Sequence, residues 1–80
     1  MNNFSWAMAE LKQGATLERQ EWNGNGMYCY AQFPDERSKM THPYLVMFIP
    51  DCTEGNIMLP WQPTQVDLFA NDWQHIQIHN

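Results

Sequence analysis

Residues 23–33 read NGNGMYCYAQF, and this stretch decides the fold because it joins a strong turn signal to an alternating segment. Asn and Gly tolerate positive φ, so Asn23 to Gly26 predicts a tight reversal of the chain. From Met27 to Phe33, side chains at odd and even positions face opposite ways, as in a strand whose two faces differ. A turn followed directly by such a strand predicts an antiparallel sheet.

Further strands are expected on both sides of this stretch. Tyr44 to Ile49 is apolar at every position, which is typical of a strand covered on both faces. An 80-residue monomer can hardly cover both faces of a sheet, so this segment predicts contact with another copy of the chain. Short connections are expected throughout. The remaining predicted segments are strands at Ala15–Gln20, Asn56–Leu59 and Trp73–Ile78, a loop at Pro34–Pro43 and a turn at Pro50–Gly55.

Two helices complete the expected fold. Phe4, Ala7, Met8 and Leu11 form one apolar stripe at helical spacing, and the helix is expected to run from Phe4 to Gly14 after an Asn3 cap. A second, short helix is expected from Gln65 to Ala70. Thr64 would cap it, with Asp67 at the third helical position of a capping box. The sequence therefore predicts one α+β domain over residues 1–80, with an N-terminal helix, an antiparallel sheet of about five strands and a short helix before the last strand.

Composition limits the function. Nine acidic against four basic residues give a net charge of −5, which argues against binding a long nucleic acid through its phosphates. No apolar run approaches the ~20 residues of a membrane span, and two cysteines cannot build a disulfide framework. A cytoplasmic location is expected. Four tryptophans are many for 80 residues, which indicates that part of the aromatic surface serves a ligand or a partner.

The sequence offers no catalytic or metal-binding set, and no cofactor is expected. His75 and His79 lie about 13 Å apart on a strand, too far to share one ion. Cys29 lies within an apolar strand, where a buried and inert thiol is the usual outcome. Cys52 lies in a predicted turn without a recognisable catalytic motif around it.

The first candidate binding segment surrounds the glycine-rich turn. Backbone N–H groups of such turns can hold phosphate oxygens without net positive charge, which nominates Asn23 and Gly24. Trp22 would offer a face for a base, and Arg19 would hold a phosphate or a ribose edge, with Met27 beside them. An ordinary hairpin turn explains the same residues equally well.

The second candidate segment is centred on Trp61. Prolines at positions 60 and 63 stiffen the chain and fix the direction of the indole. Thr64, Gln65 and the start of the second helix would donate hydrogen bonds to an anion. The alternative is a core tryptophan beside a helix cap. Together the two segments indicate either a pocket for a flat, phosphate-bearing small molecule or a protein-binding surface.

These segments resemble a family of small phage and prophage domains that includes the second Thoeris anti-defence protein. The similarity runs nearly end to end, through the helix from Phe4 to Gly14, the Trp-Asn-Gly-x-Gly sequence at positions 22–26, and the Pro-Trp…Gln-x-Asp…Asp-Trp sequence at positions 60–73. Many relatives carry a lysine between the two glycines of the turn, where this chain has Asn25.

The resemblance implies a homotetrameric sponge that captures a cyclic ADP-ribose isomer made by the TIR-domain sensor of Thoeris and does not cleave it. Some relatives also hold cyclic dinucleotides at separate sites. Family pockets lie between protomers with aromatic residues against the bases, which nominates Trp22, Asn23, Trp61, Gln65 and Asp67, with Arg19 and Met27 as neighbours. The alternative hypothesis is a protein–protein interaction module that covers a host factor.

Overall fold

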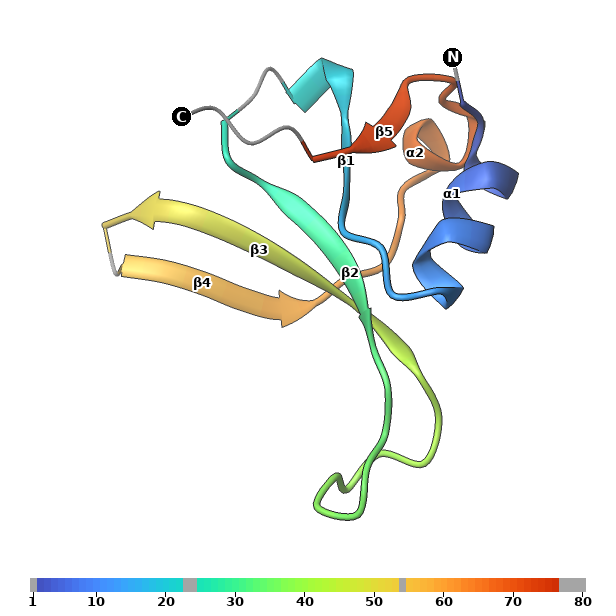
Figure 1. The fold of residues 1–80 in the computed structure, drawn as a ribbon. Helices are drawn as coiled ribbons and strands as arrows, with labels where there is room; N and C mark the ends of the chain where they lie inside the picture. Colours follow the sequence, from blue (N-terminus) through green and yellow to red (C-terminus); the bar gives the residue numbers. More distant parts are fainter. Residues whose placement is uncertain (1, 23–24, 54, 77–80) are drawn as a thin grey trace.

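The computed structural model describes residues 2–22, 25–53 and 55–76. A five-stranded antiparallel sheet lies against two helices, both on the same side of it (Figure 1). The elements are α1 (Phe4–Lys12), β1 (Leu17–Arg19), a 3₁₀ turn (Gln20–Trp22), β2 (Tyr28–Gln32), β3 (Tyr44–Cys52), β4 (Gly55–Pro60), α2 (Gln65–Phe69) and β5 (Trp73–His75). The predicted α+β fold is confirmed.

The strands lie in the order β4-β3-β2-β1-β5. Consecutive strands from β1 to β4 are neighbours, but β5 pairs with β1 at the edge opposite to β4. The expectation of short connections is therefore wrong for the last strand. The segment between β4 and β5 contains α2 and runs from one edge of the sheet to the other (Figure 1). Backbone hydrogen bonds from Trp73 N–H to Asn2 O and from Gln20 N–H to Asp72 O fix β5 at this edge.

The core lies between the helices and one face of the sheet. Leu17 pairs with Cys29 and Cys29 pairs with Met47, so these three side chains form a row on the same face. Ala7 and Leu11 of α1 are completely buried against this core. Trp73 is also buried, and its indole N–H donates to the carbonyl oxygen of Asp67 at 3.1 Å, which satisfies the polar edge of the ring.

Both helices begin as the sequence predicts. The side chain of Asn3 accepts a hydrogen bond from Trp6 N–H at 2.9 Å, which confirms the N-cap of α1. The helix ends at Lys12, two residues before Gly14, which adopts a positive φ of 93°. Thr64 caps α2 through the predicted capping box with Asp67. No helix among the described residues is long and apolar enough to cross a membrane.

The strand bounds differ most from the prediction in three places, while the ends of β2 and β4 differ by a single residue. The segment predicted as Ala15–Gln20 is a strand only over Leu17–Arg19, and Gln20 begins the 3₁₀ turn that follows it. The turn predicted at Pro50–Gly55 is shorter: β3 continues to Cys52 and β4 begins at Gly55, with an irregular register between Ile49 and Cys52. Pro50 falls within this irregularity, where a strand tolerates a residue without an N–H. β5 ends at His75, and residues 77–78 of its predicted length lie outside the described residues.

The chain reverses between β1 and β2, where the turn is expected. Asn25 N–H donates to the carbonyl oxygen of Trp22 at 3.2 Å. Gly26 has a φ of 84°, and a side chain there would meet a Pro50 ring carbon at 3.0 Å, so both conformation and space require glycine. Asn23 and Gly24 themselves lie outside the described residues.

The second face of the sheet carries aromatic and apolar side chains that point away from the helices. Tyr28 pairs with Phe48 across β2 and β3, and their rings stack with centroids 4.6 Å apart. Tyr30 pairs with Val46 in the same way, and Met58 of β4 stands opposite Phe48 with 60% of its surface exposed. We call Tyr28, Tyr30, Phe48 and Met58 the open sheet face; Val46 lies between them and is buried. The pattern of Tyr44–Ile49, apolar on both sides, thus corresponds to one covered and one open face.

Candidate functional site

Three of the four tryptophans meet at one end of the core. Trp22, Trp61 and Trp73 contact each other pairwise, with ring centroids 5.6 to 6.2 Å apart. Trp73 is buried, whereas Trp22 and Trp61 are half-buried and pack against the core from the outside. The two segments that the sequence nominates, around positions 22 and 61, are therefore brought together in space. We call these three residues the tryptophan cluster.

The geometry of the tryptophan cluster limits how it can hold a base. Trp22 and Trp61 meet nearly at right angles, with 83° between the ring planes. A base stacks face to face on an aromatic ring, so the two rings do not form the parallel walls of one slot in this arrangement. Each indole keeps a part exposed to solvent. Met27 is half-buried beside the same core and fits the core interpretation of these segments.

Arg19 is linked to this cluster through Asp67, whose carbonyl oxygen accepts from the Trp73 indole, and it is surrounded by carboxylates. Its Nε donates to Asp72 at 2.8 Å and one terminal nitrogen donates to Asp67 at 2.9 Å, while the other terminal nitrogen pairs with Glu21. The Arg19 side chain is only 8% exposed. Its guanidinium therefore faces the interior. The sequence analysis expects instead that this group is free to hold a phosphate or a ribose edge. We call Arg19, Glu21, Asp67 and Asp72 the Arg19 ion cluster.

The carboxylate of Asp67 is saturated by internal donors. One oxygen accepts from Arg19, and the other accepts from Thr64 N–H at 2.8 Å and from Thr64 Oγ1 at 2.9 Å. Both residues nominated at the start of α2, Thr64 and Asp67, thus act as its cap. Gln65, the third, is exposed.

Two members of the Arg19 ion cluster, Asp72 and Arg19, have shifted pKa values. Burial raises the pKa of Asp72, but hydrogen bonds from Arg19 and from Glu21 N–H outweigh burial and hold that pKa below its usual value. Burial lowers the pKa of Arg19, and its bonds to Asp72 and Asp67 more than compensate, so the guanidinium stays charged. The cluster therefore ties β1, α2 and the residue before β5 together through charge-assisted hydrogen bonds.

Comparison with known proteins identifies the family. The Thoeris anti-defense 2-like domain matches residues 2–76. The chain belongs to this family. It is also similar to "Thoeris anti-defense 2" of Bacillus phage SP01, with 29% identity over 80 residues, which cover 89% of this chain and 90% of that protein. Membership in this family supports an anti-defence role for the chain.

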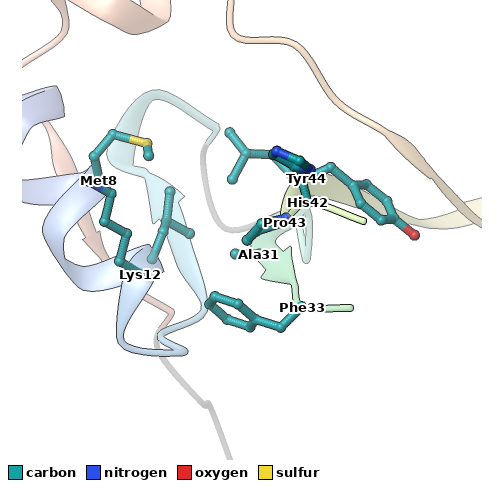
Figure 2. Close-up of a pocket in the computed structure, with 9 residues that line it drawn as sticks. Met8, Lys12, Ala31, Phe33, His42, Pro43 and Tyr44 are labelled. Atoms are coloured by element: carbon teal, nitrogen blue, oxygen red, sulfur yellow. The ribbon is translucent and has the colours of Figure 1, made fainter. Parts of the chain in front are cut away.

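This Thoeris anti-defense 2-like domain has a cavity of about 300 Å³ that the sequence analysis does not predict. Figure 2 shows Met8 and Lys12 of α1 on one side, with Phe33, His42 and Pro43 on the other. The full lining is Met8, Leu11, Lys12, Ala31, Phe33, His42, Pro43, Tyr44 and Leu45. We call it the α1 cavity. The predicted helix stripe and strand face contain several of these residues, but neither pattern indicates that an open space remains between them.

The remaining candidates for chemistry in the Thoeris anti-defense 2-like domain have structural explanations. Cys29 is fully buried, and burial raises the pKa of its thiol to about 12, in agreement with the inert thiol expected from its strand. His75 lies 2.8 Å from a carboxylate oxygen of Glu10. Within residues 2–22, 25–53 and 55–76, no three His, Cys, Asp or Glu side chains gather as a metal site.

Proposed function

We propose that this domain binds and sequesters a nucleotide immune signal without cleaving it, in the cytoplasm of an infected bacterium. The proposed ligand is a cyclic ADP-ribose isomer, with cyclic dinucleotides as further ligands. The observation that carries the proposal is the match of the Thoeris anti-defense 2-like domain to nearly the whole described chain, residues 2–76. A protein that counters defence by sequestration needs a binding surface and no catalytic machinery.

The proposed ligand surface is the exposed part of the tryptophan cluster and the segments that flank it. Trp22 and Trp61 are each half-buried, so each keeps some aromatic surface for stacking a base. The exposed Gln65 at the start of α2 is proposed to offer its amide, and Asn23 and Gly24, which lie outside the described residues, are proposed to supply backbone donors. Thr64 and Met27, which the sequence also nominates, are proposed to support this surface, because Thr64 caps α2 and Met27 packs against the core.

Arg19 and Asp67 enter this proposal as residues that hold the surface in place. Their ion pair is 2.9 Å long, and the side chains are 8% and 9% exposed. The pair ties β1, which leads to Trp22, to α2, which follows Trp61. A change at either position is therefore expected to act on binding through the position of the tryptophans.

The ligand surface is proposed to be completed by a second copy of the chain, in a homo-oligomer that the family resemblance implies is a tetramer. The open sheet face supports self-association, because Tyr28, Tyr30 and Phe48 leave an aromatic surface that no helix of the chain covers among the described residues. The perpendicular arrangement of Trp22 and Trp61 adds to the argument. Since the two rings do not enclose a base between them, a partner copy would supply the opposing wall.

The test is to look for a bound nucleotide in protein purified from cells that produce a cyclic ADP-ribose signal. The protein is heated, the supernatant absorbance near 260 nm is recorded, and the released compound is identified by mass spectrometry. The proposal predicts an intact cyclic nucleotide in the supernatant. Release of a linear hydrolysis product would indicate an enzyme, and absence of any nucleotide, with a host protein copurifying instead, would favour the interaction module.

A further inference from the structure

The basic residues of this acidic chain are distributed unevenly. Of the four Lys and Arg residues, Arg19 is buried in its ion cluster. The other three are Lys12 at the end of α1, and Arg37 and Lys39 in the loop between β2 and β3. All three are exposed, and none forms an ion pair with another described residue. Lys12 lines the α1 cavity, and the loop that carries the other two ends at His42 and Pro43 in its wall.

The wall of the α1 cavity is almost entirely apolar. Phe33, 42% exposed, extends its ring toward α1, where Met8 lies on the opposite side (Figure 2). Lys12 and His42 are the ionisable groups of the lining besides the Tyr44 phenol, and Figure 2 shows the Tyr44 ring directed away from the space. No described Asp or Glu lines it, although acids outnumber bases nine to four in the chain.

Acidic groups near this region are accounted for. Glu10, on α1, pairs with His75, and that pair lies outside the lining. Asp35 accepts a hydrogen bond from Arg37 N–H within the loop, and Glu36 is exposed beside it. Neither loop carboxylate belongs to the wall. The positive charge at the mouth of the cavity is thus supplied by Lys12.

We propose that the α1 cavity is a second binding site, separate from the tryptophan cluster, for a small molecule that joins a flat apolar group to an anionic group. The flat group enters between α1 and Phe33, and the carboxylate or phosphate stays at the mouth beside Lys12. A volume of about 300 Å³ with apolar walls and few polar groups is typical of small-molecule sites. The cavity shares no lining residue with the tryptophan cluster.

A competing occupant is present in the chain itself. Phe69 on α2 is 80% exposed, with Val66 64% exposed on the same helix, so a second copy offers an apolar side chain of suitable size. The charge pattern favours the small anion, because the exposed face of Phe69 provides no negative partner for Lys12. Insertion of Phe69 is therefore the outcome that the experiment must distinguish.

The experiment uses the full chain and amide NMR spectra recorded during titration with 1-naphthyl phosphate and, separately, with the uncharged 1-naphthol. We expect 1-naphthyl phosphate to shift the amide signals of residues 8–12, 31–33 and 44–45 in a saturable way. The neutral naphthol is expected to shift the same signals with weaker affinity. A parallel titration with AMP shows whether a nucleotide or only a simpler aromatic anion fits the site.

Two matched variants test the roles of charge and wall. Lys12→Gln and Lys39→Gln each remove one exposed positive charge, but only Lys12 lines the cavity. Lys12→Gln is expected to weaken 1-naphthyl phosphate about two- to fivefold, with the naphthol unaffected and Lys39→Gln near the parent. Phe33→Ser, at a position exposed enough to tolerate the change, is expected to weaken both compounds.

Several results would overturn the proposal. Equal losses in Lys12→Gln and Lys39→Gln would mean that a general field, and not the cavity, attracts the anion. Shifts confined to other parts of the chain would exclude the cavity as the site. If the signals of residues 8–12 and 31–33 move on dilution without ligand, and Phe69→Ser abolishes this movement, the cavity holds a second copy. Trp22→Ala is expected to leave the shifts that 1-naphthyl phosphate causes at residues 8–12 and 31–33 unchanged, so failure of this proposal and failure of the proposed function are separate results.

Discussion

Replacing Arg19 by methionine tests whether the Arg19 ion cluster holds the two halves of the candidate site together. Methionine keeps much of the apolar stem and removes all three charge-assisted hydrogen bonds, to Asp67, Asp72 and Glu21. Removal of one partner from a buried ion pair costs about 3–5 kcal/mol, because the other charge stays buried without compensation. The full penalty falls on Asp67, whose side chain is 9% exposed.

The expected cost lies at the lower end of this range. Asp72 is 21% exposed and Glu21 66% exposed, so water can solvate both when Arg19 is lost. Asp67 also keeps its two donors from Thr64. We therefore expect a loss of about 3 kcal/mol in the free energy of unfolding. With a slope of about 1 kcal/mol per molar urea, the unfolding midpoint would fall by about 3 M.

The assay is urea unfolding followed by tryptophan fluorescence, since three of the four indoles meet beside this ion cluster. All variants are measured at the same protein concentration, because self-association contributes to apparent stability. Arg37→Met is the matched control: Arg37 is exposed and forms no ion pair with described residues, so its loss should cost less than about 0.5 kcal/mol. The double variant Arg19→Met/Asp67→Asn also removes the buried Asp67 charge, so it should recover part of the free energy of unfolding that Arg19→Met loses. A midpoint for Arg19→Met within 0.5 M of the parent, a shift of roughly 0.5 kcal/mol at this slope, would refute the reasoning.

Three further predictions concern binding, pH and assembly. In calorimetric titrations, Trp22→Ala or Trp61→Ala should weaken binding of a cyclic nucleotide by about 1–3 kcal/mol, roughly tenfold to a hundredfold. Trp6→Ala should bind like the parent, because Trp6 contacts His75 and is not part of the tryptophan cluster. Equal affinity in folded Trp22 and Trp61 variants would mean that these rings serve only the core. Because the pKa of Asp72 is lowered by folding, its contribution to stability is complete above its unfolded value near pH 4 and is lost as pH falls through the folded value. The urea midpoints of the parent and Asp72→Asn should therefore converge in acid, and a constant difference down to pH 2 would contradict this. Light scattering should return a mass well above 9.5 kDa for the parent and a smaller mass for Phe48→Ser on the open sheet face, and a monomeric parent would contradict the assembly proposal.

The elements that local sequence determines were predictable. The Asn3 cap and the Thr64–Asp67 capping box depend on residues within one helical turn, and both are present in the structure. The alternation of Met27 to Phe33 also predicts the two faces of β2 correctly: Cys29 is buried, and Tyr28 lies on the other side of the sheet. Periodicity and capping carry this information within a few residues.

Features that depend on distant segments were not predictable in the same way. Arg19 shares a strand face with Leu17, so its alternation already places it toward the core, but its partners Asp67 and Asp72 lie 48 and 53 positions further along the chain. Trp73 reads only as the start of a last strand, yet it is a centre of the core because β5 returns to pair with β1. Such long-range pairings leave no local pattern in a single sequence.

The candidate site was predictable in part. The sequence nominates Trp22 and Trp61 from separate loops, and the structure brings them into contact. It does not indicate that their rings meet at 83°, or that Asp67 also pairs with Arg19. The α1 cavity leaves no signal, because its lining comes from α1, β2, β3 and the loop between β2 and β3, which only the fold brings together.

Calorimetric titration of the purified chain with a panel of cyclic ADP-ribose isomers and cyclic dinucleotides tests the central claim most directly. Each bound compound is then recovered by heat denaturation and identified by mass spectrometry. Sequestration predicts saturable binding of at least one cyclic nucleotide and its recovery with unchanged mass after long incubation. Absence of binding across the panel, or recovery of a cleaved product, would contradict it.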